Sequence, residues 1–283
     1  MTAVVSDPEI RRILVALDAS RHSQHALEVA VQLAAWHNAE VEGLYVEDIN
    51  LLRLAALGVG QEIGPTSPSP LPIEPGQLAR RLSLGAAEAR RSLADAAERH
   101  SVRWAFRVER GNVASVICHA AGEVDIVALG RAGSGRPGPG RLGSTAHALT
   151  DLLPQSVIVV QAPVTTGQNV MTFFDGSECG RRAVTTAASL CERLQARLVI
   201  LATERTAPAA AAGATPLAAE AAELAGDLDV AFRVRTIRTN ADLVRAIREE
   251  DPSLCIVGCE TTSEGSLLRQ LASRLPVSVY LVK

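Results

Sequence analysis

Short apolar runs alternate with longer stretches of helical periodicity along almost the whole chain. The apolar runs predict buried strands near 12–17, 41–46, 103–109, 125–129 and 156–161, and again near 169–174, 197–202, 230–236, 254–258 and 277–282. Helical patterns lie between them, near 22–37, 75–100, 113–121 and 144–152. This alternation predicts an α/β fold with doubly wound parallel sheets, and right-handed crossovers restrict its topology.

The chain is an internal repeat. Its two copies begin alike, with an apolar run that ends in Asp, a small residue and Ser, at 18–20 and at 175–177. They also end alike, because a Gly-Ser pair at 143 and at 265 precedes a proline by 11 positions in both copies. We therefore predict two tandem domains, residues 1–163 and 168–283, with a short linker between them.

Composition narrows the class of protein. Hydrophobic residues make up 47% of the chain and aromatic residues only 3%, so the core must be aliphatic. A net charge of −3 and the lack of an apolar run near the ~20 residues that cross a bilayer argue against nucleic-acid and membrane partners. The start of the chain does not resemble a signal peptide, and five scattered cysteines are typical of reduced thiols. We expect a cytoplasmic protein.

One loop of the first copy has a sequence that is typical of phosphate binding. An apolar run ends at Gly130, a basic loop rich in glycine follows, and a helical pattern restarts at Ser144. Glycines let backbone N–H groups approach an anion, and a helix N-terminus adds free N–H groups and a positive dipole end. The pattern predicts a phosphate cradle, with arginines such as Arg131 and Arg141 as charge partners.

The two copies differ at two places. The first copy carries an insertion at 48–76, with a leucine-rich start and a proline-rich run that predicts an irregular loop. This insertion is either a lid or partner-binding flap, or a tolerated surface loop. In the second copy the phosphate loop is shorter, since Gly258 and Gly265 are 7 positions apart where Gly130 and Gly143 are 13 apart, and it carries acids in place of arginines. We expect only the first copy to bind a nucleotide through this loop.

With Asp18 and the Gly-x2-Gly-x9-Gly-Ser spacing of Gly130, Gly133, Gly143 and Ser144, the chain resembles the universal stress protein family in its tandem form. The resemblance implies two Rossmann-like domains, similar to the adenine nucleotide α-hydrolases, each with a five-stranded parallel sheet of order 3-2-1-4-5. It also implies that ATP, with or without Mg²⁺, or another adenine nucleotide is the ligand. The implied nucleotide-binding residues are Asp18, Val46, Gly130, Arg131, Gly133, Arg141, Gly143, Ser144 and Thr145.

The resemblance gives these residues distinct roles. Asp18 would contact the adenosine, the backbone near Tyr45 and Val46 the adenine, and the loop amides with Ser144 and Thr145 the phosphates. It further implies pairing through the fifth strands, here 156–161 with 276–282 within one chain, and a homodimer is compatible with it. Ala19 departs from the family pattern, where glycine is common.

Other interpretations stay open. Asp18 could simply cap the following helix, and Asp175 could be a cap or a relic. No catalytic base, P-loop, dinucleotide motif or metal-ligand set is evident, so the protein is at most a weak ATPase. The favoured hypothesis is a stress-response sensor or regulator that binds an adenine nucleotide. The alternatives are a nucleotide-independent scaffold, with the insertion docking a regulatory partner, and a slow ATPase.

Overall fold

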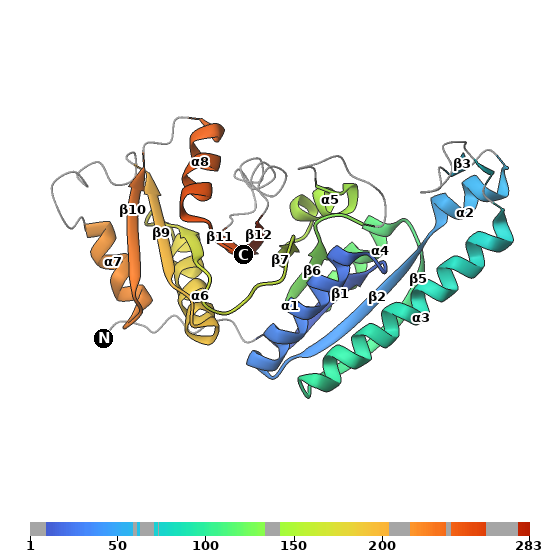
Figure 1. The fold of residues 1–283 in the computed structure, drawn as a ribbon, viewed down its shortest axis with the longest axis horizontal. Coiled ribbons are helices and arrows are strands. Elements are labelled where there is room, and N and C mark those ends of the chain that lie inside the picture. Colours follow the sequence, from blue (N-terminus) through green and yellow to red (C-terminus); the bar gives the residue numbers. More distant parts are fainter. Residues whose placement is uncertain are drawn as a thin grey trace.

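Ten strands form one continuous sheet in the computed structural model, which describes residues 10–58, 61–62, 71–72, 74–133, 142–203, 216–235, 239–258 and 277–283 (Figure 1). The first half comprises β1 (Arg12–Leu17), α1 (Arg21–His37), β2 (Glu40–Asp48), α2 (Ile49–Ala56), β3 (Gln61–Glu62), β4 (Leu71–Pro72), α3 (Pro75–Arg99), β5 (Arg103–Gly111), α4 (Val113–Ala121), β6 (Ile126–Gly130), α5 (Ser144–Leu152) and β7 (Ser156–Val160). The second half comprises β8 (Val170–Phe173), α6 (Glu178–Leu194), β9 (Leu198–Thr203), α7 (Pro216–Ala225), β10 (Val230–Arg235), α8 (Asn240–Glu250), β11 (Leu254–Gly258) and β12 (Ser278–Val282).

The strand order is β10-β9-β8-β11-β12-β7-β6-β1-β2-β5. Within each half the neighbouring strands are parallel, and each half has the order 3-2-1-4-5 that the family resemblance implies. The expected α/β fold is therefore present. In this order β1 lies between β2 and β6, so the ends of these three strands share one edge of the sheet.

The two halves join through their fifth strands, as predicted. β7 and β12 pair antiparallel, with Val157 opposite Leu281 and Val159 opposite Val279. The buried Ser278 strengthens the joint, because its hydroxyl accepts a hydrogen bond from Gln161 N (3.1 Å) and donates one to Ala162 O (3.2 Å). Pairing covers an edge that each half would otherwise expose.

Two aliphatic layers enclose the sheet. Helices α1, α3, α6 and α7 bury their apolar faces on one side, and α4, α5 and α8 bury theirs on the other. Many of the buried helical positions are alanines, such as Ala30, Ala34 and Ala187, which let helix and sheet approach closely. Both faces of central strands such as β6 and β11 are covered, which explains why their sequences are continuous apolar runs, whereas β5 at the edge alternates exposed residues with partly buried ones.

The leucine-rich start of the insertion forms a helix, α2, which the sequence pattern did not predict. α2 forms because Asp48 caps it, with Asp48 Oδ1 accepting a hydrogen bond from Asn50 N (2.9 Å). α2 packs against α3 (Figure 1), and the two-residue strands β3 and β4 pair antiparallel. Most of the proline-rich run, at 63–70 and 73, lies outside the described residues.

Candidate functional site

A cavity of about 390 Å³ opens where β1, β2 and β6 end. Seven residues predicted from the sequence line it: Asp18, Val46, Gly130, Gly133, Gly143, Ser144 and Thr145. They come from three strand ends and from the start of α5, and the fold brings them together across more than a hundred positions of sequence. The volume falls in the range of small-molecule sites, ~300–1,000 Å³.

The turn after β1 holds Asp18 at the cavity wall. Asp18 Oδ1 accepts a hydrogen bond from Ser20 N (3.0 Å), and Ala19 between them has a positive φ of 59°. Ser20 caps α1, since its Oγ accepts from Ser23 N (3.2 Å), and the same hydroxyl donates to Ala132 O (3.4 Å) beyond β6. The idea that Asp18 itself caps the helix is wrong: Ser20 is the cap, and Asp18 orders the turn.

Each glycine of the loop motif has its own structural role. A Cβ at Gly130 would lie 2.7 Å from the carbonyl carbon of His22 and 2.8 Å from Ser23 N, so this glycine lets α1 start directly against β6. A Cβ at Gly133 would lie 2.7 Å from Asp18 Oδ2. Gly143 donates its N–H to Arg131 O (2.9 Å), which draws the start of α5 onto the end of β6.

The N-terminus of α5 faces the cavity. Gly143 is its N-cap residue, and no side chain among the described residues caps it. Ser144, Thr145 and Ala146 line the cavity, and the N–H groups of a first helical turn have no acceptor inside the helix. This end therefore offers several donors and the positive end of a helix dipole.

Of the two arginines predicted to bind phosphate, only Arg131 lies among the described residues. Arg131 is only 5% exposed, and burial lowers the pKa of its guanidinium. It is not among the described residues that line the cavity. Its backbone N–H donates a hydrogen bond to Val160 O (2.9 Å). Arg141 and the rest of 134–141 lie outside the described residues.

The sequence did not reveal the apolar wall of the cavity. Beside Val46, this wall includes Leu51 of α2, Leu82 of α3, and Val113 and Ile117 of α4. Apolar residues on helices resemble core positions, so sequence alone offered no signal apart from the place of the insertion after β2. Asp48 and Tyr45 also line the cavity; burial, followed by the charge of Asp18, raises the pKa of Tyr45.

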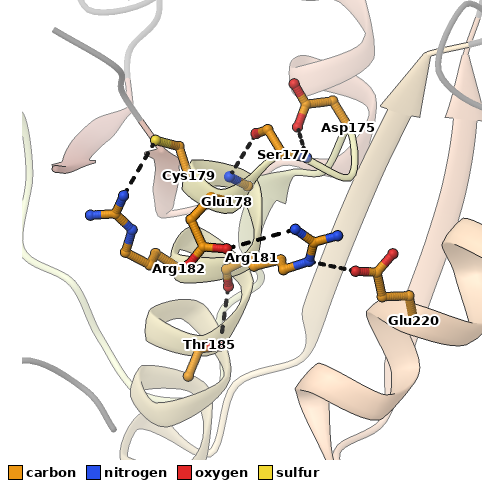
Figure 2. Close-up of polar contacts among 9 residues, drawn as sticks. Asp175, Ser177, Glu178, Cys179, Arg181, Arg182, Thr185 and Glu220 are labelled. Atoms are coloured by element: carbon orange, nitrogen blue, oxygen red, sulfur yellow. Dashed lines mark hydrogen bonds and ion pairs between the residues drawn. The ribbon is translucent and has the colours of Figure 1, made fainter. Parts of the chain in front are cut away.

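The second half repeats the turn but elaborates it differently (Figure 2). Asp175 Oδ1 accepts from Ser177 N (2.9 Å), and Ser177 Oγ caps α6 by accepting from Gly180 N (3.0 Å), so the cap is again the serine and not Asp175. Arg181 reaches across to Glu220 of α7 (2.6 Å), which ties α6 to its neighbour, as Figure 2 shows. The shortened loop after Gly258 falls in 259–276, outside the described residues.

The close approach at Gly130 also has a counterpart in the second half. A Cβ at Gly258 would lie 2.0 Å from Cys179 O, at the start of α6. The glycine that ends the fourth strand is thus required by packing in both halves, whether or not a ligand loop of full length follows it.

The fold and cavity define a doubly wound α/β protein with a ligand-sized cavity at the carboxyl edge of its sheet. The chain belongs to the universal stress protein family, whose family model matches residues 9–161, the first copy of the repeat. No curated protein matches the chain significantly.

Solved structures that match nearly the whole chain share this architecture. A universal stress protein from Archaeoglobus fulgidus DSM 4304 has a TM-score of 0.70 and 16% identity, over 96% of this chain and 96% of that chain. A putative universal stress protein from Pseudomonas aeruginosa UCBPP-PA14 has a TM-score of 0.66 and 14% identity, over 97% and 93%. A universal stress protein in complex with cAMP is 26% identical over 42% of this chain and 98% of that chain, with a TM-score of 0.34.

The described residues hold neither a metal-binding cluster nor a membrane-spanning helix. No three His, Cys, Asp or Glu side chains there form a group that could hold a metal ion. None of the described helices combines the length and the apolar character that crossing a membrane requires.

Proposed function

We propose that the first half binds an adenine nucleotide, ATP or a relative, and that this ligand acts as a regulatory signal for a stress-response protein. One observation carries the proposal: a single cavity of about 390 Å³ is lined both by the Asp18 carboxylate and by the N-terminus of α5 with its glycines. A carboxylate suits ribose hydroxyls or a base amino group, and a helix N-terminus suits phosphate.

The strand order supports one orientation of the ligand. Across the sheet edge β2, β1 and β6 follow in turn, so Val46, Asp18 and Gly130 lie in a row. Neighbouring strands are ~4.8 Å apart, and the row therefore spans about 10 Å. This row matches a nucleotide with its adenine near β2, its ribose near Asp18 and its phosphates near β6 and α5. The carboxylates of Asp18 and Asp48 would repel phosphate, and the dipole of α5 would attract it.

The crowding around the glycines also fits a phosphate cradle. At Gly133 a Cβ would reach Asp18 Oδ2 at 2.7 Å, and at Gly143 a Cβ would lie 3.3 Å from Ala132 Cα and Arg131 O. Side chains here would fill the space between Asp18 and α5. Ser144 and Thr145 would add hydroxyl donors to the backbone N–H groups of the first turn.

Calorimetric titration with ATP tests the proposal, and the repeat provides a matched control. Asp18→Ala removes the carboxylate that lines the cavity, and Asp175→Ala removes its counterpart in the second half. We expect Asp18→Ala and Gly133→Glu to weaken ATP binding by about tenfold or more, a loss of roughly 1.4 kcal/mol, while Asp175→Ala binds like the wild type. Equal affinities in all four proteins would exclude this site.

A signalling role is proposed because the described residues that line the cavity offer no base for hydrolysis. The ionisable side chains among these lining residues are Asp18, Tyr45 and Asp48. The carboxylates of Asp18 and Asp48 each accept a hydrogen bond from a backbone N–H. Phosphate release at saturating ATP should therefore stay at the buffer rate. Release that falls in Asp18→Ala but not in Asp175→Ala would instead support the slow ATPase. A homodimer, a regulatory partner and a cytoplasmic location stay predictions.

A further inference from the structure

The cavity has an apolar end that belongs to the insertion of the first half. Leu51 of α2 and Leu82 of α3 line it, together with Val46 near the end of β2. Leu51 is 41% exposed, although it contributes to the cavity wall. A half-exposed leucine at a cavity mouth still has apolar surface that a ligand could cover.

The arrangement of charge determines which part of the ligand meets these leucines. The carboxylate of Asp48 lines the same end, and Asp18 lies between this end and the start of α5. Phosphates are repelled by both carboxylates and attracted by the α5 N-terminus, so they occupy the opposite end. The group left to face Leu51 and Leu82 is the nucleobase, whose flat faces can pack against leucine side chains.

We propose that Leu51 and Leu82 form a clamp on the faces or edge of the nucleobase and supply much of the affinity for the base. The inference rests on the proposed nucleotide site, and it assigns the start of the insertion to ligand binding. Leu51 lies three positions after Asp48, on the helix whose start this carboxylate caps. The neighbouring α3 supplies the second leucine, and α2 packs on α3 (Figure 1).

The test separates the two ends of the ligand. ATP, adenosine and inorganic tripolyphosphate are titrated, the last as a competitor of ATP, into the wild type, Leu51→Ala and Leu82→Ala. Each variant has a control of the same type on the same helix that does not line the cavity: Leu54→Ala (44% exposed) on α2 and Leu84→Ala (60% exposed) on α3. Circular dichroism checks that all variants are folded.

We expect Leu51→Ala and Leu82→Ala to weaken ATP and adenosine by the same factor, about five- to twentyfold, and to leave tripolyphosphate unchanged. Leu54→Ala and Leu84→Ala should bind all three like the wild type. Unchanged ATP affinity in both clamp variants, or equal weakening of all three ligands, would overturn the clamp while leaving the nucleotide site in place. ATP binding that is insensitive to Asp18→Ala would instead overturn the nucleotide site and the clamp with it.

Discussion

Gly130 is the position where a single methyl group most directly tests the packing beneath the site. A Cβ there would lie 2.7 Å from His22 C, 2.8 Å from Ser23 N and 3.0 Å from His22 Cβ. Two of these three atoms are backbone atoms of the first turn of α1, so the strain cannot be relieved by rotating a side chain. Gly130→Ala must move α1 away from β6.

The geometry sets the size of the effect. Ordinary contact begins near 3.4 Å, so the first turn must retreat by about 0.7 Å from the 2.7 Å contact. Overpacking of this kind costs roughly 1–3 kcal/mol, and the lower entropy of the unfolded alanine chain offsets about 0.4–1 kcal/mol. We expect a net loss of about 1–2 kcal/mol, which for a chain of this size lowers Tm by roughly 2–8 °C.

Two further glycines serve as controls in urea unfolding followed by circular dichroism. Gly76, the second residue of α3, has nothing within 4 Å of a built Cβ, so Gly76→Ala should stabilise by about 0.5–1 kcal/mol. Gly133→Ala meets only Asp18 Oδ2, a side-chain end that can turn away, so its stability should stay within about 0.5 kcal/mol of the wild type while ATP binding weakens. If Gly130→Ala were as stable as Gly76→Ala, the close approach of α1 to β6 would be wrong.

Three other predictions follow from the described residues. Ala19 and Gly176 occupy equivalent turns with φ of 59° and 82°, a region that favours glycine. Ala19→Gly should therefore raise the free energy of unfolding by about 1 kcal/mol, and Gly176→Ala should lower it by about 1 kcal/mol. Urea titrations measure both changes, and changes of the opposite sign would contradict this. Thr172 is fully buried in β8, and its Oγ1 lacks a hydrogen-bond partner in the part of the chain described. Thr172→Val should therefore raise the free energy of unfolding by about 1 kcal/mol. A less stable variant would point to an unrecognised partner. Burial raises the pKa of Cys191 and of Cys255 to about 12, so both thiols stay protonated in the folded protein at pH 8 and at pH 10. A short iodoacetamide pulse read by mass spectrometry should leave both unmodified at either pH and label them in urea; labelling of the native protein that rises with pH would refute the burial.

The sequence predicted the ten strands of the large sheet within two residues of their observed bounds. This worked because the central parallel strands are covered on both faces and are therefore mostly apolar, and because Ser20 and Ser177 mark the helix starts that follow the first strand of each half. The same reasoning missed α2, whose eight residues follow an Asp cap and are rich in leucine. A short apolar segment beside a proline-rich run has no clear period, so only its packing on α3 identifies it as a helix.

The candidate site was predictable at one end only. Asp18 and the glycines could be found because the turn and the phosphate cradle depend on local backbone chemistry, which a motif records. Leu51, Leu82 and Ile117 could not be found, because a leucine or isoleucine on an amphipathic helix looks the same whether it faces the core or a cavity.

By itself, therefore, the sequence determined the repeat, the alternation of strands and helices, and the residues that bend the chain at Asp18 and at Gly143. The tertiary structure alone decided which apolar side chains meet around the cavity, and it showed that the close approach of α1 requires a glycine at position 130. It also showed that Arg131, a predicted phosphate partner, is buried and not among the cavity-lining residues. The physical reason is the range of the interactions: turns and caps act between neighbouring residues, whereas burial and steric contact act between groups that only the folded sheet brings within a few ångströms.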